Sequence, residues 1–190
     1  MRRPGLTYHD GSRTLQDRFD SRRLADRLAE RMSRTAFTDE DRAFIESRTM
    51  FFLATADAAG QPDCSYKGGL AGFVRVTGAS ELSFPSYDGN GMFRSLGNVL
   101  ANPRVGLLFL DFEQPRRLRV NGIARLDDST TEFEGAQLVV RVQAETIFPN
   151  CPRYIHRLKL VEASPYAPRP GYEPPEPGWK QHFKDVLPGS

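Results

Sequence analysis

Few of the residue patterns that mark catalytic or metal sites occur in this sequence. Its 190 residues include only two cysteines, Cys64 and Cys151, and three histidines. The cysteines do not form a CxxC motif, which argues against a disulfide framework and a structural zinc site and fits a reducing compartment. No HExxH, GxSxG or Walker motif and no GxGxxG after a strand is present, which disfavours hydrolases and nucleotide motors. We therefore name no catalytic acid or base and no metal ligand.

The sequence also lacks an excess of charge and a long apolar run. Its 26 basic and 24 acidic residues leave a formal net charge of +2, which provides no strong field for nucleic acid or an anionic membrane. No uncharged run approaches the roughly 20 residues that span a bilayer, and no apolar stretch follows the basic start, as a signal peptide requires. We expect a soluble, cytoplasmic protein that binds neither nucleic acid nor membrane.

What remains is one domain with two appendages. A hydrophobic content of 39% is enough for a single core. We predict an N-terminal helical extension over residues 1–37, the main domain over 38–162 and a proline-rich tail over 163–190. The extension has an apolar stripe that we expect to pack on the main domain or on a partner subunit: Leu24, Leu28 and Met32.

The tail contains six prolines between Ser164 and Gly178, so it should be extended. Trp179, Phe183 and Leu187 are available to anchor its end on the main domain or on a partner subunit.

Short β-type runs separated by turn residues fill the main domain. Thr38 and Asp41 form a capping box that opens a short helix ending near Arg48, and a second helix is expected over Met92–Ala101. Many strands and few helices favour a mostly β fold with flanking helices, closed or nearly closed as a barrel. The expected strands are Met50–Thr55, Asp63–Lys67, Phe73–Val76, Glu81–Phe84, Arg104–Leu110, Leu118–Leu126, Leu138–Phe148 and Arg157–Val161.

Two stretches have residues that suit a phosphorylated, planar ligand. The first runs from Phe84 to Asn98 and joins a strand end, a glycine-rich turn and a helix start, where free backbone N–H groups favour a phosphate. Arg94 would add a cation, and Ser86 and Asn90 would add neutral donors. In the alternative interpretation, the glycines serve only the turn and Arg94 is solvated.

The second stretch, Cys64–Gly69, places polar donors beside two glycines that let a ring approach the backbone. Lys67 and Arg117 could face the electron-rich edge of a flavin, whereas Tyr66, Phe84 and Pro85 could cover its ring. The alternative is a lysine on the rim of the fold beside ordinary core aromatics.

The order of several segments resembles the FMN-binding split barrels related to pyridoxamine 5'-phosphate oxidase, over residues 38 to 162. The resemblance implies a split β-barrel, a homodimer and bound FMN. The segments that carry it are Phe51–Thr55, Gly60–Pro62, the GNGMFRSLGN stretch, Asn102–Phe109 and Val120–Leu126.

The resemblance also implies the residues of the cofactor site. The second subunit would complete the pocket, with segment 150–154 or Trp179 reaching across the interface. The vitamin oxidase has an arginine near the position of Ser65, so we expect a branch distinct from that enzyme. The implied residues are Ser65, Tyr66, Lys67, Gly68, Pro85, Ser86, Asn90, Gly91, Met92, Arg94, Asn98, Arg117, Arg153 and Trp179.

The leading functional hypothesis is a flavin-dependent oxidoreductase that passes electrons between small-molecule partners. A deazaflavin reductase is a second possibility, with a basic face formed by Arg22, Arg23, Arg27 and Arg31.

Other classes remain open. The protein could be a non-catalytic binder or sensor of flavin or haem, with His156 as the candidate haem ligand. An interaction protein that docks an acidic partner through the N-terminal helix is a further alternative. Cys151 could be a reactive thiol beside Arg153 or an inert buried cysteine.

Overall fold

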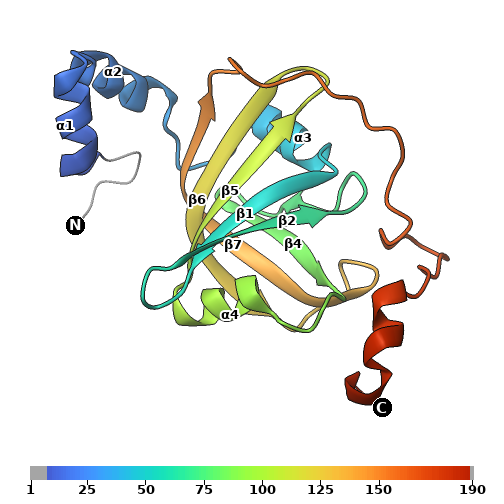
Figure 1. The fold of residues 1–190 in the computed structure, drawn as a ribbon. Coiled ribbons are helices and arrows are strands. Elements are labelled where there is room, and N and C mark those ends of the chain that lie inside the picture. Colours follow the sequence, from blue (N-terminus) through green and yellow to red (C-terminus); the bar gives the residue numbers. More distant parts are fainter. Residues whose placement is uncertain (1–7, 189–190) are drawn as a thin grey trace.

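The computed structural model describes residues 8–188 and is dominated by one antiparallel sheet (Figure 1). The helices in this range are α1 (Asp10–Arg18), α2 (Arg22–Met32), α3 (Asp39–Glu46), α4 (Arg94–Ala101) and the 3₁₀ helix η1 (Gly178–Val186). The strands are β1 (Met50–Ala56), β2 (Pro62–Gly68), β3 (Arg75–Val76), β4 (Glu81–Tyr87), β5 (Arg104–Asp111), β6 (Arg116–Asp127) and β7 (Ala136–Asn150).

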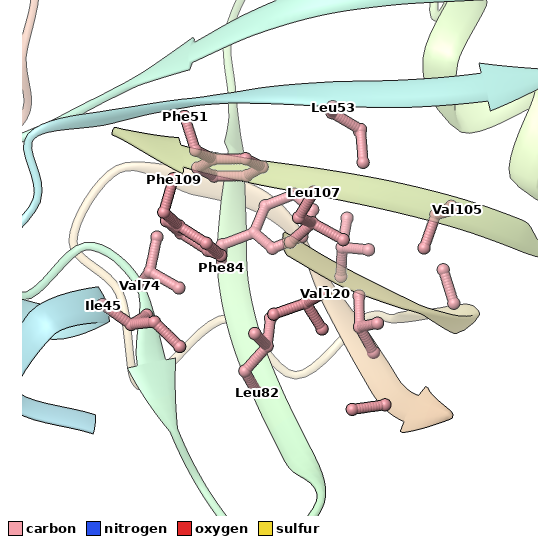
Figure 2. Packing of buried hydrophobic residues seen from close by; sticks show 14 of the residues in the cluster. Ile45, Phe51, Leu53, Val74, Leu82, Phe84, Val105, Leu107, Phe109 and Val120 are labelled. Atoms are coloured by element: carbon pink, nitrogen blue, oxygen red, sulfur yellow. The ribbon is translucent and has the colours of Figure 1, made fainter. Parts of the chain in front are cut away.

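The sheet curls on itself into a barrel. Its strand order is β2-β1-β5-β6-β7-β4-β3, and each neighbouring pair in this order is antiparallel. Strands β1 and β4 lie far apart in that order, yet the rings of Phe51 and Phe84 meet edge to face at 4.9 Å between centroids. Phe51 also contacts Phe109 at 5.2 Å, so the three rings fill the interior (Figure 2). The predicted mostly β split barrel is confirmed.

Alternating side chains explain why the barrel has one apolar interior. In β5, Val105, Leu107 and Phe109 are buried, whereas the residues between them are partly exposed. This period of two is the expected pattern for a strand with one face on the core. Figure 2 shows Leu107 beside the phenylalanine rings, and Leu82 and Val120, from two further strands, belong to the same core cluster.

Helix α4 links the two distant edges of the sheet. It follows β4, which lies next to the β3 edge, and its polar residues contact the opposite edge of the strand order. Ser95 Oγ donates to Asp63 of β2 at 3.3 Å, and Asn98 Nδ2 donates to Thr55 of β1 at 3.0 Å. The helix therefore packs across one end of the barrel, against β1, β2 and β6 (Figure 1).

The predicted capping box at Thr38 and Asp41 is confirmed. The Thr38 hydroxyl accepts from the Asp41 N–H, and the Asp41 carboxylate accepts from the Thr38 N–H, both at 3.1 Å. Asp41 is buried and also binds the guanidinium of Arg34 at 2.8 Å. The backbone of Arg34 pairs with Ile147 of β7, so this cluster attaches the N-terminal extension to the barrel.

Some predicted element boundaries are wrong. The strand expected over Arg157–Val161 is absent: Leu158 N–H donates to Phe112 O at 3.1 Å, just beyond β5, but no ladder of backbone pairs forms there. Of Phe73–Val76, only Arg75 and Val76 form a strand. The helix expected from Met92 begins at Arg94, because Phe93 adopts a left-handed conformation with φ of 47°.

The N-terminal helices stand apart from the barrel in Figure 1. Leu24 is 61% exposed and Leu28 is 45% exposed, so their stripe does not dock on the barrel of its own chain. Packing of this stripe on a partner subunit stays a prediction.

The tail runs past the barrel without α-helix or strand over residues 164–177 and ends in η1. In η1, Trp179 and Phe183 contact each other at 6.3 Å and are both exposed. They therefore do not anchor the tail in the core. No helix within residues 8–188 has the length and apolarity needed to cross a membrane.

Candidate functional site

Strand β2 presents a polar row to the interior at an open edge of the sheet. Asp63 and Lys67 lie opposite Thr55 and Phe51 of β1, both of which are buried. Directly opposed residues in an antiparallel pair share a face, so the polar row faces the interior side of the sheet. Ser65, between them, completes the row. Charged and hydroxyl groups are thus concentrated at an edge with unpaired backbone groups.

Lys67 is the cation of this row that lacks a partner. Its side chain is half-buried, and burial lowers the pKa of the ammonium, an effect that the Asp63 carboxylate partly offsets. Within residues 8–188, no hydrogen bond or ion pair involves its Nζ. A partly desolvated ammonium without an acceptor is costly, so this group favours an anionic or electron-rich ligand.

The start of α4 lies against the same row. Arg94 Nε is 3.6 Å from Asp63 Oδ1, and the Arg94 guanidinium is otherwise largely exposed. Before the helix, Gly91 has φ of 71°, and Asn90 Oδ1 accepts from the Met92 N–H at 3.1 Å. This turn exposes Asn90, Gly91 and Met92 beside the first N–H groups of the helix.

The end of β4 contributes a rigid, mostly buried segment. Pro85 is buried and Ser86 is half-buried, at an irregularity in the pairing with β7. Burial raises the pKa of the neighbouring Tyr87, an effect that Arg75 partly offsets. The Ser83 hydroxyl is buried without a partner among the described residues. The β4–α4 loop therefore connects the hydroxyl-bearing end of β4 with Arg94 at the start of α4.

Other predicted residues lie on the outer face of the sheet. The Tyr66 ring packs edge to face on Phe52 at 6.2 Å. It also covers Gly68, where an added Cβ would come within 2.6 Å of that ring. Arg117 alternates with the buried Leu118, so it too faces outward, and its buried Nε has no partner in the described chain. One chain alone does not bring Arg117 to Lys67.

Arg153 and Trp179 are also separate from the polar row. Arg153 is exposed in the turn after β7, where its N–H donates to Cys151 Sγ at 3.4 Å. Cys151 is exposed, so its interpretation as a buried, inert cysteine is wrong. Trp179 is exposed, although the adjacent Lys180 pairs with Asp88 at 2.5 Å and so holds the tail against the β4–α4 loop.

Sequence reasoning missed Asp63 and Ser95. Strand alternation could have identified Asp63 as a site residue, because it shares a face of β2 with Lys67 four residues later. Its contact with Ser95 joins residues 32 positions apart and has no local signal.

A separate cavity of about 540 Å³ was also not anticipated, at the end of β1 nearest α3. There Arg48 pairs with Asp111 at 2.7 Å. Burial raises the pKa of Asp111, but the N–H of Gln114, Arg48 and the N–H of Glu113 together lower it below its usual value. No group of three or more His, Cys, Asp or Glu residues in the described part of the chain could hold a metal ion.

Comparison with known proteins identifies similar folds. A family model described as pyridoxamine 5'-phosphate oxidase matches residues 37–165. A candidate pyridoxamine 5'-phosphate oxidase from Lactobacillus delbrueckii is 21% identical with a TM-score of 0.50, covering 60% of this chain and 95% of that chain. HupZ from Group A Streptococcus is 19% identical with a TM-score of 0.48, covering 65% of this chain and 99% of that chain. An FAD-binding protein from Mesorhizobium loti is 15% identical with a TM-score of 0.42, covering 63% of this chain and 99% of that chain. No curated protein matches the chain.

Proposed function

Because this chain belongs to the pyridoxamine 5'-phosphate oxidase family, we propose that it binds FMN and acts as a flavin-dependent oxidoreductase. The observation that carries this proposal is the ammonium of Lys67, half-buried and without an acceptor at the open edge of β2. An enzyme of this kind needs no acid–base triad, which agrees with the lack of catalytic motifs in the sequence. Its partners would be a small-molecule electron donor and acceptor.

The donor set fits a flavin with a phosphate. Lys67 and Arg94 supply two cations, and the α4 start and the turn at Asn90 supply N–H groups. Ser65 and Ser86 add hydroxyl donors, and the buried, rigid Pro85 would limit movement of the ring. When bound, FMN supplies hydride or one-electron transfer, whereas these side chains bind and orient it.

The proposal includes a homodimer formed through the outer sheet face. Phe52, Tyr66, Leu108 and Phe148 lie in one cross-strand row of that face, and each is at least partly exposed. Arg119 lies between Leu108 and Phe148 in this row, with its guanidinium over the Phe148 ring at 5.8 Å. An exposed row of aromatic and apolar side chains with an arginine is typical of a protein–protein interface. In such a dimer, Arg117, Arg153 and Trp179 would contact the flavin bound by the other subunit, and the buried Arg117 Nε would obtain an acceptor.

An absorption spectrum of the purified protein, before and after addition of FMN, tests the cofactor. We expect two flavin bands that bleach on reduction with dithionite or NADPH. Lys67→Met should bind FMN weakly, whereas Lys159→Met, at an exposed lysine outside the polar row, should bind normally. Sedimentation of the same sample measures the dimer.

A colourless protein that takes up no FMN would refute the proposal. Deazaflavin binding would then be measured, together with haem binding by wild type and a His156→Ala variant. His156 is exposed in the segment after β7.

A further inference from the structure

An acidic side chain lies among the groups that would hold the phosphate. The Asp63 carboxylate is 3.6 Å from Arg94 Nε and accepts from Ser95 Oγ at 3.3 Å. The Asp63 side chain is only 20% exposed, whereas that of Arg94 is 66% exposed. The carboxylate is therefore the more desolvated member of the pair, and its field acts on whatever binds at the start of α4.

The carboxylate offsets half of the positive charge of this cluster. Lys67 and Arg94 contribute two positive charges and Asp63 one negative charge, which leaves a surplus of one positive charge. A phosphate monoester carries a charge of about −2 at neutral pH, since its second pKa is about 6. Two cations alone would match this charge, but the cluster with its carboxylate does not. The uncharged ribityl chain of riboflavin meets no such repulsion.

We propose that Asp63 determines the charge selectivity of this site by reducing its preference for a phosphorylated flavin over an unphosphorylated one. The inference rests on the proposed flavin site. Asp63 holds the Arg94 guanidinium toward the strand and repels a dianion at the helix start. The wild-type protein consequently prefers FMN to riboflavin less strongly than it would without this carboxylate.

A structural role for Asp63 is separable from this electrostatic role. Asp63→Asn removes the charge but keeps an oxygen that can accept from Ser95, so the α4 contact can persist. Asp63→Glu keeps the charge. Glu145→Gln is the matched control, because it neutralises a carboxylate paired with Arg104 at 3.0 Å on a different strand.

The experiment is fluorescence titration of each variant with riboflavin and with FMN at neutral pH and low salt. We expect the ratio of the two dissociation constants to shift toward FMN by about tenfold in Asp63→Asn. It should stay within about twofold of wild type in Asp63→Glu and Glu145→Gln. If Asp63→Asn lacks a cooperative melting transition, Asp63→Ser replaces it in the same titration.

An unchanged ratio in a folded, flavin-binding Asp63→Asn variant would overturn the charge-selectivity role and leave the proposed function standing. Failure of every protein, including wild type, to bind either flavin would instead overturn the proposed function, and the role of Asp63 with it.

Discussion

Gly122 offers a severe test of the barrel, because backbone atoms fill the space where a side chain would lie. It is buried in β6 at an irregularity in the pairing with β7. A Cβ added there would overlap the carbonyl oxygen of Gln143 and lie 2.9 Å from its carbonyl carbon and 3.1 Å from Ala144 Cα. None of these atoms can move away by a change of rotamer, so β6 and β7 would have to separate locally.

Overpacking of this kind costs about 3 kcal/mol, at the upper end of its usual range. For a chain of this size, Gly122→Ala should lower the melting temperature by roughly 6–12 °C. Gly97→Ala is the matched control, because an added Cβ on this exposed position of α4 has no described atom within 4 Å. It should stabilise the protein by about 0.5–1 kcal/mol through helix propensity.

Circular dichroism melting of the two variants and wild type measures both effects. A Gly122→Ala protein that melts within about 2 °C of wild type would refute the pairing of β6 with β7 at this register.

Three further predictions concern charged groups. Asp41→Ala should destabilise the protein by about 2–4 kcal/mol in urea denaturation, because it removes half of the capping box and leaves Arg34 without its carboxylate; a loss below about 0.5 kcal/mol would contradict this. The pKa of Asp111 is lower in the folded protein than in the unfolded chain, where it is about 3.9, so the ionised carboxylate stabilises the fold. This stabilisation is fully present above the unfolded pKa and is lost as the pH falls through the folded pKa. Urea midpoints measured from about pH 7 down to pH 3 should therefore fall less steeply in Asp111→Asn than in wild type, and equal slopes would count against the Arg48 pair. FMN binding should weaken as pH rises through the lowered pKa of Lys67, because the ammonium loses its charge. Lys67→Met should bind roughly tenfold more weakly at neutral pH and lack this alkaline dependence in a fluorescence titration, and a retained dependence would assign it to another group.

The sequence predicted local structure correctly where the residues that determine it lie close together in the chain. The Thr38–Asp41 capping box is specified by residues three apart, and its geometry is as predicted. Strand alternation likewise identified most of the sheet, since each barrel strand has one buried face. The family resemblance then supplied the curled arrangement that local patterns do not specify.

Predictions failed where strand formation or a site contact depends on residues that are distant in sequence. Residues 157–161 have a strand-like composition, but their position is set by the contact of Leu158 with Phe112, more than 40 residues earlier, and no ladder forms. The approach of Asp63 to Arg94 and Ser95 depends on α4 reaching across to β2, which no local pattern encodes. Lys67 and the start of α4 therefore form an inner group, whereas Tyr66, Arg117, Arg153 and Trp179 lie outside it, although the sequence presents them as one set.

The strand order also affects how the chain folds during synthesis. Strand β4 emerges from the ribosome early, but its long partner is β7, where Glu81 pairs with Gln143 and Tyr87 with Ala136. Until those later residues emerge, β4 has only the two-residue β3 as a sheet neighbour, and Phe84 has an incomplete core. Pairings between distant segments form slowly and leave unpaired strand edges exposed to aggregation. The nascent barrel therefore passes through a stage at which a chaperone would have an apolar strand to bind.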